Sequence, residues 1–149
     1  MSAKDGHLHL LSHSGGQGGE ASLTHQDSTC TAPLTIEPVT EGHAQVIPSN
    51  HYREILELPG HVAGHMFEEA KKIARSCART TLRCESVSIV MCNGAAASQA
   101  VFHTHIHDNP RFEGDGFSWN LPPGFAAPPT HTRLDRTPAL LRDARALTP

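Results

Sequence analysis

The sequence lacks the features that would mark a membrane protein or a nucleic-acid-binding protein. It has no run of eighteen apolar residues and no apolar segment at its start, so we expect neither a membrane-spanning helix nor a secretory signal. The formal net charge is only −3 over 149 residues, which gives no general electrostatic case for binding nucleic acid. We therefore expect one domain with a modest core and no membrane or nucleic-acid partner.

The cysteines also lack a familiar pattern, because none of them forms a C-x-x-C pair. The chain has four, which are Cys30, Cys77, Cys84 and Cys92. Because the sequence shows no secretory signal, a reducing cytoplasm is the default location, and we expect the cysteines to be free thiols.

Histidine, by contrast, is abundant, with twelve residues in the chain. Three of them, His103, His105 and His107, stand at alternate positions beside Phe102 and Ile106, which favour a strand. Side chains two residues apart on a strand point to the same face. The spacing therefore predicts a row of three imidazoles.

Such a row has two chemical interpretations and one trivial interpretation. Neutral imidazole is a common ligand for zinc, copper or nickel, so the row could hold a metal ion. Alternatively, one ring could act as a nucleophile while a second donates a proton and the third fixes a tautomer. Because the chain is rich in histidine, an accidental cluster is the third possibility.

The segments around this row resemble those of the histidine-triad (HIT) superfamily of nucleotide hydrolases and transferases. The resemblance covers residues 93–107, 110–111 and 113–117, and upstream it covers residues 36–43, 46–48 and 50–52. These segments occur in the family's order between about residues 34 and 119. The upstream group resembles the part of those proteins that opens the nucleotide pocket.

The resemblance and the apolar pattern together predict an α+β fold. We expect an antiparallel sheet of about five strands with one long helix and one or two short ones. Apolar residues at three- and four-residue steps predict the long helix at about residues 61–82. Residues 34–149 would form the HIT-like domain, with a Pro/Gly-rich loop at 118–136 and a C-terminal helix or tail at 137–149. The resemblance also implies a homodimer.

Residues 1–33 are expected to be disordered or irregular. Residues 15–19 have the composition of a flexible linker, and apolar periodicity is absent around them. HIT proteins usually open with a β-hairpin, often preceded by a C-x-x-C pair that binds zinc in some members, and neither feature is recognisable here. His61 and His65 share a helix face and could bind metal, as could three tail residues, His7, His9 and His13. We predict no metal site from either group.

The resemblance implies a role for each histidine of the row. His105 would attack the α-phosphorus of a nucleoside phosphoramidate, a dinucleoside polyphosphate or a related nucleotide, and water would resolve the nucleotidyl-histidine intermediate. Its other ring nitrogen would donate to a backbone carbonyl near His103. His107 would bind the phosphate or the bridging atom and assist the departure of the leaving group. No cofactor is implied, and the other implied substrate-binding residues are His43, Asn93, Gln99 and Ile36.

Three positions depart from the family pattern and bear on turnover. Thr35 stands where the family commonly has a carboxylate that accepts both ribose hydroxyls. Ala100 stands where a Ser or Thr hydroxyl can serve the leaving group, and Asp108 would raise the imidazole pKa values if it faced the row. We therefore keep two alternatives to an enzyme, namely a weak or inactive HIT-fold nucleotide-binding or regulatory protein and a metal-binding histidine row.

Overall fold

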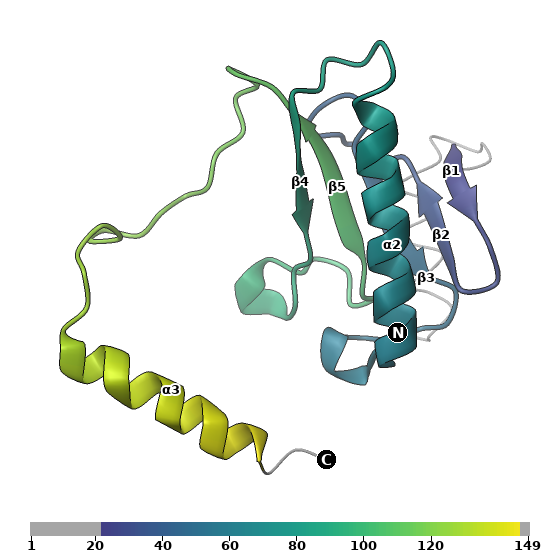
Figure 1. Cartoon of the computed structure of the whole chain (residues 1–149). Coiled ribbons are helices and arrows are strands. Elements are labelled where there is room, and N and C mark those ends of the chain that lie inside the picture. Colours follow the sequence, from purple (N-terminus) through teal and green to yellow (C-terminus); the bar gives the residue numbers. More distant parts are fainter. Residues whose placement is uncertain (1–21, 147–149) are drawn as a thin grey trace. The chain divides into compact units, whose positions relative to one another are not determined.

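The structure is a computed structural model that describes residues 22–146. The chain divides into two compact units, Met1–Phe117 and Ser118–Pro149. The described part of the first unit contains five strands, one long α-helix and two 3-10 turns (Figure 1). In chain order these are β1 (Leu23–Gln26), β2 (Cys30–Pro33), β3 (Ala44–Pro48), η1 (Ile55–Glu57), α2 (Gly60–Cys77), β4 (Ser86–Val90), η2 (Ala95–Ala97) and β5 (Ile106–Arg111). The predicted α+β class is confirmed.

The five strands form one sheet in the order β1-β2-β3-β5-β4, and every neighbouring pair is antiparallel. β5, the last strand along the described residues, therefore lies between β3 and β4. Val46 of β3 lies opposite Ile106 of β5, and Gln45 lies opposite His107. This register brings the segment before β3 next to the histidine-bearing strand.

Helix α2 packs against the sheet because its apolar residues recur on one face. That face buries Val62, Met66, Ala70, Ile73 and Cys77. The buried sheet residues that complete the core are Cys30, Ala32, Ala44, Val46 and Ile106. The long helix predicted at about residues 61–82 is thus present, although it ends at Cys77.

The prediction of an irregular segment up to residue 33 is wrong for the residues that the structure describes. β1 and β2 form a hairpin there, and a carboxylate closes its turn. Asp27 Oδ1 accepts hydrogen bonds from the backbone N–H groups of Thr29 and Cys30 at 2.7 and 2.8 Å. Each strand has only four residues, too few for a clear alternation, and β2 is buried along its whole length. The linker-like residues 15–19 and the tail histidines His7, His9 and His13 lie outside the described residues.

The second unit contains α3 (His131–Arg145), which begins earlier than predicted. The sequence suggested a start at Thr137 with Pro138 in the first turn, but Pro138 lies inside the helix. The spacing of Leu140 and Leu141 predicts a buried stripe on this helix, but this prediction is wrong because both side chains are more than half exposed. Among residues 22–146, no helix is both long and apolar enough to cross a membrane.

Candidate active site

The histidines of the row do not all lie on the strand. β5 begins at Ile106, so His107 is in the ladder, whereas His103 and His105 precede it. The rings of His105 and His107 are in contact, with centroids 4.6 Å apart. The His103 ring is fully buried, with Nδ1 2.9 Å from His51 Nδ1 and Nε2 3.1 Å from the Pro48 carbonyl. The prediction of a uniform strand through all three histidines is therefore wrong.

Three rings form a continuous chain of hydrogen bonds, which we call the histidine relay and define as His43, His107 and His105. The backbone N–H of Val39 donates to His43 Nδ1 at 3.2 Å. His43 Nε2 lies 3.0 Å from His107 Nδ1, and His107 Nε2 lies 3.1 Å from His105 Nε2. His105 Nδ1 lies 2.7 Å from the backbone carbonyl of His103. This last bond is the one that the family resemblance implied for the middle histidine.

The two ends of the relay determine where every proton lies. A neutral imidazole has one N–H donor and one acceptor nitrogen. Because His43 Nδ1 accepts from an amide, its proton is on Nε2 and is donated to His107 Nδ1. His107 then carries its proton on Nε2 and donates it to His105 Nε2, while His105 donates from Nδ1 to a carbonyl. All four bonds are satisfied, and Nε2 is the nitrogen of the His105 ring that carries the lone pair.

Burial keeps the three rings neutral. Burial, followed by repulsion from His105, lowers the pKa of His43 to about 4. Burial, with repulsion from His105 and His43, lowers the pKa of His107 to about 3. Burial also lowers the pKa of His105, although its hydrogen bond to the His103 carbonyl opposes this. At neutral pH all three are therefore uncharged, as an imidazole nucleophile must be.

Asp108 neither faces the relay nor points to solvent, so it does not raise the imidazole pKa values as it would if it faced the row. It follows His107 on β5, so their side chains point to opposite faces of the sheet. Its side chain is fully buried, and neither carboxylate oxygen has a hydrogen-bond partner among the described residues. Burial raises the pKa of Asp108 to about 7. Asp108 therefore does not lie beside the three rings of the relay.

Of the predicted substrate-binding residues, Asn93 and Gln99 brace the loop before the histidine row. Gln99 is buried, and its amide bonds the Gly94 N–H at 2.7 Å and the carbonyls of Arg53 and Val101 at 2.9 and 3.2 Å. Asn93 Oδ1 accepts from the Ile55 N–H at 2.7 Å. These bonds hold the residue 93–101 loop against the segment after β3.

The remaining predicted residues occupy different environments. His43 is part of the histidine relay, whereas Ile36 is 48% exposed on the loop before β3. An exposed apolar side chain in that position is free to pack on a nucleoside. Sequence reasoning gave no role to His51, which bonds His103. Its only signal was membership of the matching segment 50–52.

The fold and this site define the class of protein, an antiparallel α+β domain with an aligned set of histidines. The profile of the HIT domain family matches residues 19–114, so the chain belongs to that family. Members of this superfamily are nucleotide-binding hydrolases and transferases. The match begins before the described residues and includes the hairpin.

Individual relatives agree with this assignment. Over 91 residues the chain is 36% identical to adenylylsulfatase HINT3 from Arabidopsis thaliana, a match covering 61% of this chain and 46% of that protein. Over 94 residues it is 37% identical to Protein hit from Bacillus subtilis, covering 62% and 64%. These matches thus span about half to two thirds of each relative. A crystal structure of a HIT family protein from Bacillus anthracis has a TM-score of 0.74 at 30% identity, covering 83% of this chain and 87% of that one.

Proposed function

We propose that the protein is a nucleotide hydrolase or nucleotidyl transferase in which Nε2 of His105 attacks the α-phosphorus of its substrate. The observation that carries the proposal is the 2.7 Å bond from His105 Nδ1 to the His103 carbonyl. It fixes the tautomer with a lone pair on Nε2 and stabilises the positive charge that forms on the ring during attack. The proposed substrates are nucleoside phosphoramidates, dinucleoside polyphosphates or related nucleotides.

The relay suggests how the nucleophile is released. Without substrate, His105 Nε2 accepts a hydrogen bond from the Nε2–H of His107. An entering phosphate offers a better, charged acceptor, so His107 would turn its N–H to the phosphate or bridging atom. The His105 lone pair is then free. His43 would hold His107 in this orientation through the 3.0 Å bond to Nδ1.

The reaction would proceed in two displacements. In the first, His105 Nε2 forms a bond to phosphorus while the bond from phosphorus to the leaving group breaks, and the leaving group departs with the electron pair. His107 donates a hydrogen bond to the bridging atom as negative charge develops there. In the second, water adds to phosphorus and loses a proton, and the P–N bond breaks with its electrons returning to Nε2. In a transferase another hydroxyl or phosphate would replace water.

A binding protein with weak or absent turnover is the second candidate, and one contact favours it. The Thr35 hydroxyl already accepts a hydrogen bond from the Glu37 N–H at 3.3 Å. A hydroxyl replaces a carboxylate there, which costs roughly 1–2 kcal/mol of nucleoside affinity. Ala100 adds no hydroxyl for a leaving group. The complete histidine relay favours the enzyme over the binding protein.

We also propose that the protein is a homodimer and that it is cytoplasmic. The dimer is supported by the family resemblance and by the β1–β2 hairpin, which supplies strands that the sequence did not predict. Native mass spectrometry of the full chain tests it, because a monomer at micromolar concentration contradicts the dimer without affecting the chemistry. Localisation of the tagged chain in its own cell tests the compartment.

Incubation with adenosine phosphoramidate, a diadenosine polyphosphate and adenylyl sulfate separates the two candidates. Wild type is expected to release AMP, and His105→Ala is expected to release none while it still binds AMP. His61→Ala is a matched control, because His61 is exposed on α2. Equal release by wild type and His105→Ala would remove the enzyme proposal. AMP binding without release by either protein would support the binding-protein candidate.

A further inference from the structure

A second cluster of ionisable side chains lies where the N-terminal hairpin meets α2. It consists of His25 on β1, Asp27 in the hairpin turn, Cys30 at the start of β2 and His65 on α2. One ligand atom from each residue lies within 4.8 Å of all the others. The cluster shares no residue with the histidine relay, and the proposed reaction does not use it.

Two of these side chains converge on one atom of a third. His25 Nε2 lies 2.9 Å and His65 Nε2 lies 2.7 Å from the same oxygen, Oδ2 of Asp27. Two imidazoles from different elements thus point into one small volume. The other oxygen, Oδ1, accepts the backbone bonds that close the hairpin turn, so the carboxylate is held in place. Such a carboxylate can offer Oδ2 to an ion without rearranging the turn.

The donor set selects among metals. Two imidazoles, a thiolate and a carboxylate oxygen suit Zn²⁺, which takes four such ligands in a tetrahedron, whereas Mg²⁺ and Ca²⁺ take oxygen ligands. Metal–ligand distances of about 2.0–2.3 Å place tetrahedral ligands roughly 3.3–3.8 Å apart. The ligand atoms lie up to 4.8 Å apart, so the longest of these distances must shorten by about 1 Å to hold the ion. Rotation of the side chains can supply this change.

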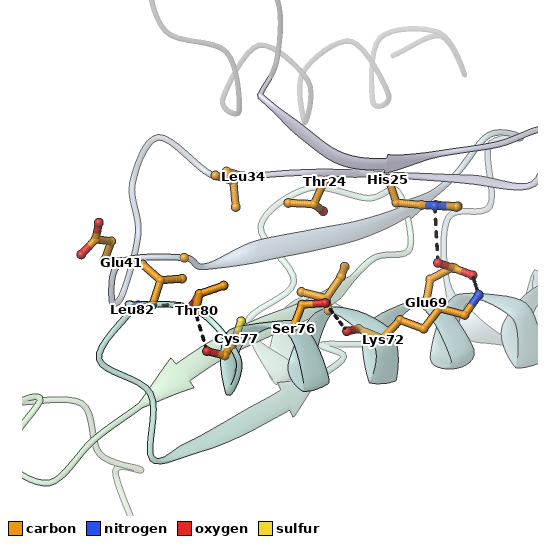
Figure 2. Close-up of a pocket in the computed structure, with 12 residues that line it drawn as sticks. Thr24, His25, Leu34, Glu41, Glu69, Lys72, Ser76, Cys77, Thr80 and Leu82 are labelled. Carbon is orange, nitrogen blue, oxygen red and sulfur yellow. Dashed lines mark hydrogen bonds and ion pairs between the residues drawn. The ribbon is translucent and has the colours of Figure 1, made fainter.

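A carboxylate behind one imidazole completes the arrangement. Figure 2 shows His25 reaching from β1 towards Glu69 on α2, with Lys72 on the other side of that carboxylate. Glu69 Oε2 lies 3.4 Å from His25 Nδ1, and the Glu69 side chain is only 4% exposed. A carboxylate on one ring nitrogen keeps the proton there and leaves the other nitrogen free for a metal. This pairing orients His25 Nε2 into the cluster.

The cluster is accessible to an ion from solvent. The side chains of His25, Asp27 and His65 are between 28% and 36% exposed, whereas Cys30 is fully buried. An ion can therefore enter from solvent and meet the thiol at the bottom of the site. The chain has no C-x-x-C pair, so this set differs from the cysteine pair that the resemblance associates with zinc in some HIT proteins.

We propose that His25, Asp27, Cys30 and His65 bind one zinc ion that cross-links the β1–β2 hairpin to α2. The ion would hold the hairpin on the helix and would take no part in the reaction at His105. Because a ligand that binds only the folded state stabilises it by mass action, zinc should raise the melting temperature.

The test uses the untagged full chain with zinc chloride alone, followed by dialysis and metal analysis. We expect one zinc per chain in wild type and in His61→Ala, whose altered residue is on the same helix outside the cluster. His65→Ala and Cys30→Ser should each lose it. Glu69→Gln should weaken the affinity by about tenfold, the lower end of the range for residues behind metal ligands.

Two further measurements keep the inference falsifiable if a variant folds poorly. Cobalt added to the metal-free protein should give a thiolate-to-cobalt charge-transfer band in wild type. The band should be weaker in His65→Gln and absent from Cys30→Ser. Zinc should raise the melting temperature of wild type and of His103→Ala, but not that of His65→Ala, with circular dichroism confirming the fold. Absence of stoichiometric zinc, or zinc retained by both His65→Ala and Cys30→Ser, would overturn the inference. Zinc lost in His103→Ala but kept in His65→Ala would move the metal to the histidine row.

Discussion

The Nε2 atom of His43 donates to Nδ1 of His107 across a 3.0 Å bond that joins residues 64 positions apart in the chain. The antiparallel pairing of β3 with β5 makes this contact, since Ala44, which follows His43, lies opposite Asp108, which follows His107. The bond sets the tautomer of His107 and, through it, the lone pair on His105 Nε2. His43 is thus a positioning residue for the proposed nucleophile.

Replacing His43 with Ala should slow turnover without abolishing it. The change removes one hydrogen bond from His107, which is worth about 1–2 kcal/mol and corresponds to about a tenfold fall in kcat. The measurement is steady-state hydrolysis of adenosine phosphoramidate, with His43→Asn as a partial rescue because its amide can still donate. A fall in AMP affinity alone, with kcat unchanged, would show that His43 binds phosphate without ordering the relay.

The rate should persist well below the usual pKa of histidine. Activity requires neutral rings, and burial lowers the pKa of His43 to about 4 and that of His107 to about 3. The value of kcat/KM should therefore stay nearly constant from pH 8 to below 6 and fall as the pH approaches about 4. A pH–rate profile checks this, and a midpoint near 6.5 would contradict it.

The lowered histidine pKa values also make the stability of the fold depend on pH. A lowered folded-state pKa means that the unfolded chain binds more protons between the folded value and 6.5. The contribution of these histidines is therefore present above pH 6.5 and is lost as the pH falls towards about 4. Acid unfolding of wild type and His107→Ala, compared between these limits, should show a shallower pH slope for the variant.

Asp108→Asn should stabilise the protein at pH 8. A pKa raised from 3.8 to about 7 means that the folded state binds more protons than the unfolded chain between these values, so stability falls as the pH rises through them. That pKa shift corresponds to about 4 kcal/mol of unfolding free energy. The buried Asn amide would also lack partners and cost part of this, so the net gain is about 1–3 kcal/mol. Urea unfolding at pH 4 and pH 8 measures it.

The exposed Asp135→Asn is the matched control for that comparison. The difference between Asp108→Asn and wild type should grow from pH 4 to pH 8, whereas the control should show no such growth. Equal stability of the two proteins at both pH values would mean that Asp108 finds a partner or solvent in the folded state.

Thr35→Asp should strengthen nucleoside binding. A carboxylate at this position can accept from two ribose hydroxyls, and the added charge-assisted bond is worth roughly 1–2 kcal/mol, or about tenfold in Kd. Calorimetric titration with AMP measures the change, and Thr137→Asp in the second unit controls for the added charge. Equal affinity for AMP and 2′,3′-dideoxy AMP in the variant would contradict the ribose contact.

Much of the fold was predictable because it depends on local pattern. Apolar residues at three- and four-residue steps predicted α2. The hairpin was missed because its strands are only four residues long and its turn depends on the Asp27 carboxylate. The early start of α3 was not predictable because Pro138 favours the first turn of a helix, whereas here it lies inside the helix.

The candidate site was predictable in composition but not in arrangement. Spacing identified His103, His105 and His107, yet the direction of the relay depends on the Val39 N–H and on strand pairing, which sequence alone does not specify. The proposed zinc site was not predictable for the same reason. Spacing along the helix pairs His65 with His61, whereas its partner in the fold is Asp27 of the hairpin.

The central claim, that His105 is the nucleophile, is tested most directly by trapping the covalent intermediate. Rapid acid-free quenching of wild type with adenosine phosphoramidate, followed by peptide mass spectrometry, should find an adenylyl group on His105 that is labile to acid. The group should be absent from His105→Ala and should accumulate in wild type faster than AMP appears. Substrate turnover with no adduct, or an adduct on His103 or His107 instead, would contradict the account.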